Sequence, residues 1–124
     1  LLNSPNNPSG VIYRGEEIDA LTGLLRRAST DLGHPVFLVS DEPYRKLVFT
    51  GSSVPPILKY YSNSIVTSSF SKDLSIPGER IGYVAVHPKA SHKTALLEAL
   101  TLANRILGYV NAPALMQRVI GEAL

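Results

Sequence analysis

Hydrophobic residues recur at helical spacing in two long stretches of the sequence. In the first stretch, the apolar side chains repeat every three or four positions and share one helix face: Ile18, Leu21, Leu24, Leu25 and Ala28. This spacing predicts an amphipathic helix from Glu16 to about Asp31, with Gly33 as its C-terminal cap. The second stretch predicts a helix from Ala90 to Leu107 that ends at Gly108. Pro113 is typical of the first residue of a further helix.

Short apolar runs bounded by Pro, Gly and polar residues are typical of buried strands. Three such runs predict strands: Val36–Val39, Ile65–Ser69 and Ile81–Val86. Leu1–Asn3 resembles the end of another strand that leads into a Pro-rich turn, and Lys46–Phe49 is a weaker extended segment. We expect a short helix at Pro56–Tyr61 and a polar loop at Ser71–Glu79.

The predicted strands alternate with predicted helices along the chain. This alternation predicts an α/β fold with a mostly parallel sheet and flanking helices. In such sheets, ligands bind just beyond the carboxyl ends of the strands. Asp41 and Ser69 lie at two of these ends. If the two strands are neighbours, their ends are about 5 Å apart, so polar groups from both can meet one ligand.

The composition is that of an ordinary globular protein, and it mainly excludes other classes. The chain has 124 residues, of which 44% are hydrophobic, and a formal net charge of +2. Its basic residues are spread along the sequence, so we expect no nucleic-acid partner, and its apolar runs are too short to cross a membrane. The lack of cysteine excludes disulfides and thiolate metal sites, and the histidines lack metal-ligand spacing. Because both ends look truncated, we expect residues 1–124 to be part of one larger domain.

Side chains that can carry chemistry gather in the loops after two predicted strands. Asp41 could pair with a cation or a protonated ring nitrogen, and Tyr44 adds a phenol to the same loop. The other loop offers hydroxyls, an amine and a guanidinium, from Ser69, Ser71, Lys72 and Arg80. A guanidinium matches phosphate oxygens with a planar fork of donors, so this loop is a candidate phosphate site. An amine beside such a site is a candidate nucleophile.

Each of these residues also has an interpretation without catalysis. A lysine in a loop is commonly a solvated charge, an aspartate often caps a turn or helix, and Tyr44 could be a packing residue. Asn7 could simply belong to an Asn-Pro turn. Arg80 could pair with Glu79 or Asp73 at the surface.

Three separated segments together carry a family resemblance. Asn3-Ser4-Pro5-Asn6-Asn7-Pro8-Ser9-Gly10 is similar to an Asn-Pro-x-Asn-Pro-Thr-Gly turn, with Ser4 in place of the first Pro and Ser9 in place of Thr. Asp41-Glu42-Pro43-Tyr44 is similar to an Asp-x-x-Tyr strand end. Ser69-Phe70-Ser71-Lys72, followed by Arg80, is similar to Ser-x-Ser-Lys and Gly-x-Arg-x-Gly. In this order and spacing they resemble the large-domain centre of fold-type I pyridoxal 5'-phosphate (PLP) enzymes, the aspartate aminotransferase superfamily.

The resemblance implies a role for each matching position. Lys72 would bind PLP covalently through its amine and later move a proton at the substrate α-carbon. Asp41 would face the pyridine nitrogen and keep it protonated, so that the ring accepts electrons. Tyr44 and Asn7 would hydrogen-bond the phenolic oxygen of the ring. The phosphate would be held by Ser69, Ser71 and Arg80.

The resemblance also implies an activity for the complete protein. It would be a cytoplasmic, homodimeric, PLP-dependent aminotransferase that transfers an amino group between an amino acid and a 2-oxo acid. A carbon–sulfur lyase or decarboxylase of the same fold stays open, as does the aminotransferase-like sensor domain of a PLP-binding transcription regulator. The family also uses a Gly-rich phosphate loop, a ring-stacking aromatic residue and a substrate-binding arginine, and none of these lies in this chain. We therefore expect residues 1–124 alone to be inactive.

Overall fold

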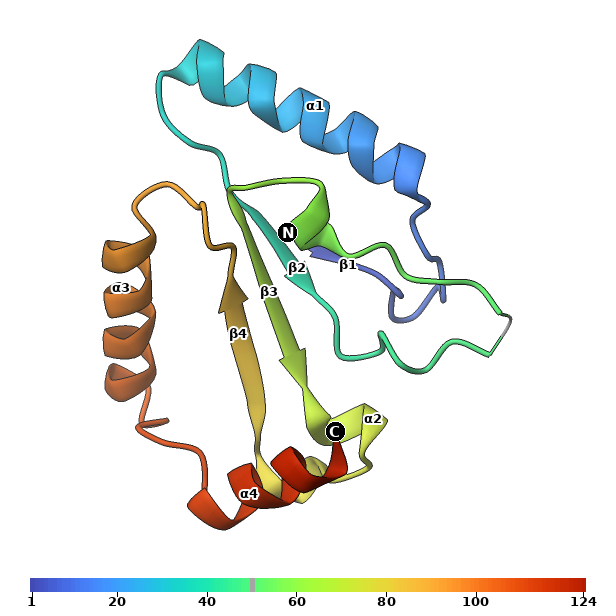
Figure 1. Cartoon of the computed structure of the whole chain (residues 1–124), viewed down its shortest axis with the longest axis vertical. Coiled ribbons are helices and arrows are strands. Elements are labelled where there is room, and N and C mark those ends of the chain that lie inside the picture. The colour runs from blue at the N-terminus through green and yellow to red at the C-terminus, as the bar shows by residue number, and fades with distance from the viewer. Residues whose placement is uncertain (50) are drawn as a thin grey trace.

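A computed structural model describes residues 1–49 and 51–124, and within them helices surround a four-stranded sheet (Figure 1). The α/β fold with a mostly parallel sheet and flanking helices is confirmed. The elements are, in chain order, β1 (Leu2–Asn3), α1 (Gly15–Leu32), β2 (Leu38–Asp41), the 3-10 helix η1 (Ile57–Lys59), β3 (Ser64–Ser69), α2 (Phe70–Asp73), the 3-10 helix η2 (Pro77–Glu79), β4 (Gly82–Val86), α3 (Lys93–Ile106) and α4 (Ala114–Ala123).

The sheet has the strand order β1-β2-β3-β4. β1 pairs with β2 and β2 with β3 in parallel, whereas β4 is antiparallel to β3, as the arrowheads in Figure 1 show. In this register Asp41 lies between Asn3 on β1 and Thr67 on β3. The carboxyl ends of β1, β2 and β3 therefore meet at one edge of the sheet, where polar residues follow each strand.

The main core lies between α1 and one face of the sheet. Ile18 of α1 is 1% exposed and belongs to a buried cluster with side chains from three strands and from the region of η1, namely Leu2, Leu38, Ile57, Tyr61 and Val66. The helix has the expected bounds to within one residue, and Gly33 ends it with a φ of 70°. That left-handed conformation is easily adopted by glycine, which has no Cβ, so the predicted cap is confirmed.

A second, smaller apolar cluster lies under α2 and joins it to α4. It contains Phe70 of α2, Ile81 and Ile120 of α4, all buried. Figure 1 shows α4 crossing the end of the sheet at which α2 lies. The helix predicted after Pro113 is therefore present, and its apolar face supports the short helix that carries Lys72.

The expected strand at Val36–Val39 is wrong in its bounds, since β2 comprises Leu38–Asp41. The Val36 N–H donates to Ser29 Oγ of α1, so this residue is bound to the helix and not to the sheet. The ladder toward β3 begins only where the Leu38 N–H donates to the carbonyl of Asn63. As a result, Asp41 is the last residue of β2 and not the residue after it.

The expected extended segment at Lys46–Phe49 is also wrong. Residues 43–46 form a turn and residues 47–49 belong to no strand. Backbone bonds from Arg45 N to the Glu42 carbonyl and from Leu47 N to the Tyr44 carbonyl close the turn. These two backbone N–H groups are therefore bonded within the turn, whereas a strand would need such groups for hydrogen bonds to a neighbouring strand.

The expected polar loop at Ser71–Glu79 contains two short helices, α2 and η2. Ser69 starts α2 as a cap, because its Oγ accepts the Ser71 N–H at 3.1 Å. The helix predicted from Ala90 to Leu107 is α3, which begins at Lys93, because the Ala90 N–H donates to the His87 carbonyl in a preceding turn. The Pro56–Tyr61 helix is confirmed as the shorter η1.

Candidate active site

Strand alternation divides the polar residues at the strand ends between the two faces of the sheet. Successive side chains on a strand point to opposite faces. Ser40 is fully buried, next to Leu38 on the α1 side of the sheet, so Asp41 projects from the opposite face. Thr67 is paired with Asp41 across the ladder, and Ser69 lies two positions further along β3. Asp41, Thr67 and Ser69 thus share the face that α1 does not cover.

Asp41 is half-buried and held by both neighbouring strands. Thr67 Oγ1 donates to Asp41 Oδ1 at 3.0 Å, and Asn3 Nδ2 donates to the Asp41 carbonyl at 2.9 Å. Among the residues that the structure describes, no lysine, arginine or histidine forms an ion pair with this carboxylate. A carboxylate has about four acceptor positions. Asp41 can therefore accept further hydrogen bonds from a cationic N–H group.

Asn7 and Tyr44 lie in contact although they are 37 positions apart in the sequence. Asn7 Nδ2 donates to the Tyr44 hydroxyl oxygen at 3.1 Å. The Asn7 loop is fixed to the end of β1, because the Asn7 N–H donates to Asn3 Oδ1 at 2.9 Å. Since the Tyr44 hydroxyl accepts from the amide, its own proton is available to another acceptor. The two residues form a local donor site above the end of β2.

The Ser69–Lys72 segment forms the start and body of α2. Ser69 Oγ donates to Ser71 Oγ at 2.7 Å, in addition to accepting the Ser71 N–H. Phe70 is buried beneath this turn, whereas Lys72 on the same short helix is exposed. In the described part of the chain, the Lys72 side chain makes neither a hydrogen bond nor an ion pair. Its amine is therefore available to a ligand at this end of the sheet.

Arg80 lies opposite α2, because the β3–β4 ladder continues from Ser69 paired with Gly82 to a bond between Phe70 N and the Ile81 carbonyl. Its side chain is exposed, and Nη1 donates to the Pro77 carbonyl at 2.9 Å. Its φ of 50° lies in the left-handed region, which is strained for a residue with a side chain and is often found at functional sites.

Gly82 is the position at which the chain returns close against β3. A Cβ built there would collide with the Ser68 carbonyl oxygen and press on Ser69 Cα. Only glycine fits without a shift of the backbone, which explains the second glycine of the Gly-x-Arg-x-Gly segment. The close approach keeps Arg80 near the end of β3.

The surface ion pairs suggested for Arg80 do not form. Asp73 Oδ2 pairs with Lys46 Nζ at 3.6 Å, and within residues 1–49 and 51–124 Glu79 has no ion-pair partner. The Lys46–Asp73 pair joins the turn that carries Tyr44 to the helix that carries Lys72. The two loops predicted to share one ligand are thus in direct contact.

A cleft of about 930 Å³ lies between β4, α3 and the segment that leads to α4. Arg80 and Thr67 line it together with Gly82 and Val84 of β4. The lining side chains in the described part of the chain do not include Asp41, Asn7, Tyr44 or Lys72. The cleft therefore borders the candidate site on the β4 side and does not enclose it.

Thr67 and Asn3 are the two contact residues that the sequence interpretation did not assign a role. Thr67 binds the Asp41 side chain, and Asn3 binds both the Asp41 carbonyl and the Asn7 N–H. Asn3 could have been found as the first residue of the turn segment. Thr67 could have been found only from the strand register, which places it beside Asp41.

A family model described as aminotransferase class I and II matches residues 1–124. The chain belongs to this family. One curated relative, an aspartate aminotransferase from Thermotoga maritima, is 30% identical over 119 residues, which are 93% of this chain and 30% of that protein.

Solved structures of family members agree with this assignment. An aminotransferase from Eubacterium rectale superposes with a TM-score of 0.93 at 50% identity, over 96% of this chain and 30% of that chain. A PLP-dependent aminotransferase from Streptococcus suis gives a TM-score of 0.69 at 30% identity, over 95% of this chain and 28% of that chain. This sequence therefore spans about 30% of the length of these family members.

The donor set at the strand ends fits the cofactor that the family resemblance implies. A half-buried carboxylate with no cation partner among the described residues suits a protonated ring nitrogen, and the Tyr44 hydroxyl suits a ring oxygen. The hydroxyls at the start of α2 and the exposed Arg80 guanidinium just before β4 suit a phosphate. Lys72 supplies the amine. In an aminotransferase of this family, these groups would hold different edges of one ring.

Within residues 1–49 and 51–124, no three or more His, Asp or Glu side chains gather as metal ligands would. Over the same residues, the helices are too short or too polar to span a bilayer.

Proposed function

We propose that the protein containing this chain is a PLP-dependent aminotransferase, which transfers an amino group between an amino acid and a 2-oxo acid. The observation that carries the proposal is the meeting of three segments at one sheet edge, in a chain of the aminotransferase class I and II family. We further propose that residues 1–124 form part of the PLP-binding large domain, and that the protein acts as a cytoplasmic homodimer.

The proposal gives each predicted residue a task at a stated atom. Asp41 Oδ2 accepts the N–H of the cofactor ring, while Thr67 holds Oδ1. The Tyr44 hydroxyl donates to the ring oxygen, while Asn7 Nδ2 donates to the tyrosine oxygen. The phosphate is bound by Ser69, Ser71 and Arg80. When bound, PLP supplies an electron-accepting ring that stabilises negative charge at the substrate α-carbon.

Lys72 has two tasks in this proposal. Its Nζ would hold the aldehyde carbon of the cofactor, and once an amino acid has displaced it the freed amine would move a proton between the substrate α-carbon and the cofactor. The support is its position on α2, where the Lys72 side chain is exposed and where the helix begins at the hydrogen-bonded Ser69 and Ser71 hydroxyls. The support of Phe70 by α4 keeps this helix in place.

The test is amino transfer by the complete natural polypeptide that contains residues 1–124, loaded with PLP. We expect 2-oxoglutarate to become glutamate when aspartate is supplied, since curated relatives are named for aspartate. Lys72→Ala should reduce the rate by about 10²- to 10⁴-fold, because proton transfer loses its base. Lys89→Ala, which removes another exposed lysine beyond β4, should leave the rate unchanged.

The same assay separates the alternative reactions. Formation of pyruvate and ammonia from a sulfur-containing amino acid, without any new amino acid, would indicate a lyase reaction in place of amino transfer. Release of carbon dioxide without amino transfer would indicate a decarboxylase. PLP binding with no turnover of any amino acid would favour a sensor domain.

A further inference from the structure

Glu42 is a buried carboxylate that the proposed cofactor contacts do not use. Only 4% of the residue is exposed, and it follows Asp41 directly. Ser40 Oγ donates to its Oε1 at 2.9 Å, and Arg45 Nη1 donates to its Oε2 at 2.8 Å. Both carboxylate oxygens are thus satisfied. A buried charge is tolerated when it is paired and hydrogen-bonded, and removal of its partner is costly.

Arg45 extends the same contact to a distant part of the chain. Its Nη2 donates to the Val54 carbonyl at 2.6 Å, and Nη1 also reaches the Pro55 carbonyl at 3.4 Å. A lysine could not reproduce this set of contacts, because a guanidinium directs several N–H donors in one rigid plane. The pair therefore fixes the turn against both the strand end and residues 54–55.

Tyr44 lies inside the loop that this ion pair closes. Glu42 precedes it by two positions and Arg45 follows it directly. The backbone bond from Arg45 N to the Glu42 carbonyl measures 3.3 Å, and the bond from Leu47 N to the Tyr44 carbonyl measures 2.9 Å. The side-chain pair and these two bonds together determine the backbone position from which the Tyr44 ring projects toward Asn7.

We propose that the Glu42–Arg45 ion pair is a positioning element that holds the Tyr44 hydroxyl at the cofactor site. This inference rests on the proposed function, because the hydroxyl matters only if the site binds the cofactor. In the described residues, the hydrogen bonds and ion pairs of the Glu42 and Arg45 side chains go to Ser40, to each other and to residues 54–55, and not to Asn7 or to the side chains proposed to bind the cofactor. The turn that carries Tyr44 is therefore the route by which we expect the pair to affect the cofactor.

A double-mutant cycle distinguishes positioning from a purely structural role. We compare PLP dissociation constants of Glu42→Gln, Tyr44→Phe and the double variant in the complete natural polypeptide. Each single change should weaken binding about 5- to 10-fold, the value of one hydrogen bond. The double variant should bind PLP as tightly as Tyr44→Phe does, to within about 2-fold, because the effects of changes at residues that act together are not additive. If the double variant weakened PLP binding by the product of the two single factors, the inference would be overturned.

Amide exchange in the cofactor-free protein gives a second and independent readout. In Glu42→Gln, the amides of Arg45 and Leu47 should exchange about 10-fold faster, because the turn opens more often. The matched control is Glu17→Gln, which alters an exposed ion pair of the same spacing and should leave these amides unchanged. Unchanged exchange in Glu42→Gln would show that the pair does not hold the turn.

The two readouts keep the two proposals apart. If the unmodified protein takes up no PLP through Lys72, the proposed function fails, while amide exchange still decides whether the pair holds the turn. If PLP binds but the cycle is additive, only the positioning role fails. Should Glu42→Gln not fold, Arg45→Lys takes its place in both experiments, since it keeps the charge and removes the planar fork; the same outcomes apply.

Discussion

The two halves of the candidate site differ in how far the chain's own contacts organise them. In the half formed by β1 and β2, the groups proposed to bind the ring are already hydrogen-bonded: Asp41 to Thr67, and Tyr44 to Asn7. In the half formed by α2 and η2, Lys72 and Arg80 are exposed and lack acidic partners among the described residues. The first half is prepared for neutral and cationic ring atoms. The second keeps its positive charges available for an anion.

This difference has a physical reason. Neutral groups, the Thr67 hydroxyl and the Asn7 amide, hold the Asp41 carboxylate and the Tyr44 phenol, so that both keep the capacity for a further hydrogen bond to a ligand. Cations that must bind a phosphate cannot be held by acidic partners, since those partners would compete with the phosphate. The comparison therefore predicts that a change in the exposed half alters affinity more than a change in the support of the organised half.

Among the variants that compare the two halves, Arg80→Ala is expected to have the largest effect on PLP affinity. The guanidinium uses one of its N–H groups on Pro77 and keeps the others for a phosphate. Its loss should weaken PLP binding about 10- to 100-fold, as for a hydrogen bond to a charged group. Binding of pyridoxal, which has no phosphate, should change less than about 2-fold.

The control for this variant is Arg118→Ala, which removes an exposed arginine of α4. Equal losses for PLP and pyridoxal in Arg80→Ala would contradict the assignment of Arg80 to the phosphate, since a general disturbance of the site affects both compounds.

A smaller effect is expected from Thr67→Val, which changes the support of the organised half. Valine keeps the branched shape that suits a strand but removes the donor to Asp41 Oδ1. PLP binding should weaken about 3- to 10-fold, near the value of one hydrogen bond. Spectroscopic titration measures it, with Thr94→Val on α3 as the control. An effect equal to that of Arg80→Ala would remove the contrast between the halves.

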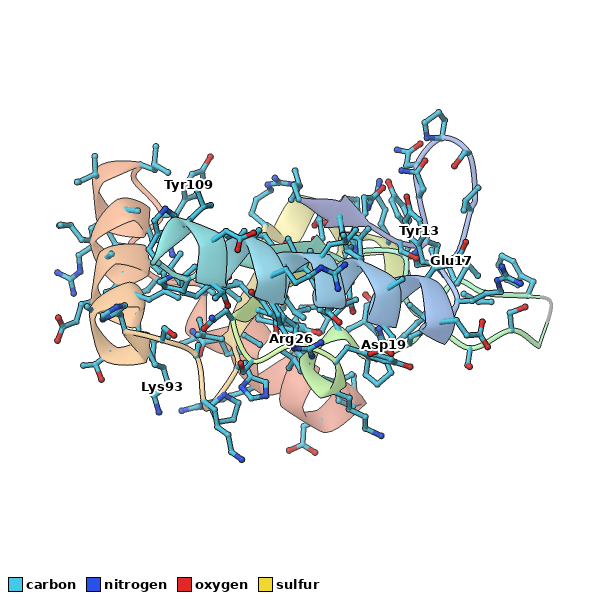
Figure 2. All side chains as sticks on the ribbon, turned by 90° about the horizontal axis from the view of Figure 1, so that it is seen from above. Tyr13, Glu17, Asp19, Arg26, Lys93 and Tyr109 are labelled. Atoms are coloured by element: carbon cyan, nitrogen blue, oxygen red, sulfur yellow. The ribbon has the colours of Figure 1, made fainter. Side chains whose placement is uncertain are left out.

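The smallest effect is expected from Glu17→Gln, in the first turn of α1, the helix on which Figure 2 labels Glu17. The hydrogen bond from the Arg14 backbone N–H lowers the pKa of Glu17 from its ordinary value of 4.5. A carboxyl group whose pKa is lowered in the folded state stabilises the fold at pH values above its pKa in the unfolded state. This contribution disappears as the pH falls through the pKa of the folded state.

Glu17→Gln should therefore slightly lower the melting temperature at neutral pH, because the charge is fully exposed and screened. The difference from the unmodified protein should disappear well below pH 4.5. Thermal unfolding at both pH values measures it. PLP affinity should stay the same, and a change in affinity would show that this end of α1 communicates with the site.

Much of the fold could be predicted because periodicity reports burial. The spacing of Ile18, Leu21 and Leu25 identified α1, and the apolar run at Ile65 identified β3. Periodicity carries no information on strand direction, so the antiparallel course of β4 was not predicted. It also missed α2, because a helix of one turn is set by the Ser69 cap and by burial of Phe70 and not by a repeating pattern.

The candidate site could be predicted as a set of residues but not as a network. Asp41 and Ser69 were found at strand ends from pattern alone, and their shared edge follows from the parallel pairing. The Asn7–Tyr44 bond and the Lys46–Asp73 pair connect segments far apart in the chain, and no local pattern encodes them. The catalytic and binding roles of the predicted residues remain predictions.

The covalent attachment of PLP to Lys72 is the most direct test of the account. The complete natural polypeptide is incubated with PLP, reduced with borohydride, digested and analysed by mass spectrometry. We predict that the cofactor is found on the peptide that contains Lys72 and that Lys72→Ala abolishes the adduct. Attachment to Lys46, Lys59, Lys89 or Lys93 in its place, or no attachment at all, would contradict the assignment of the strand-end site.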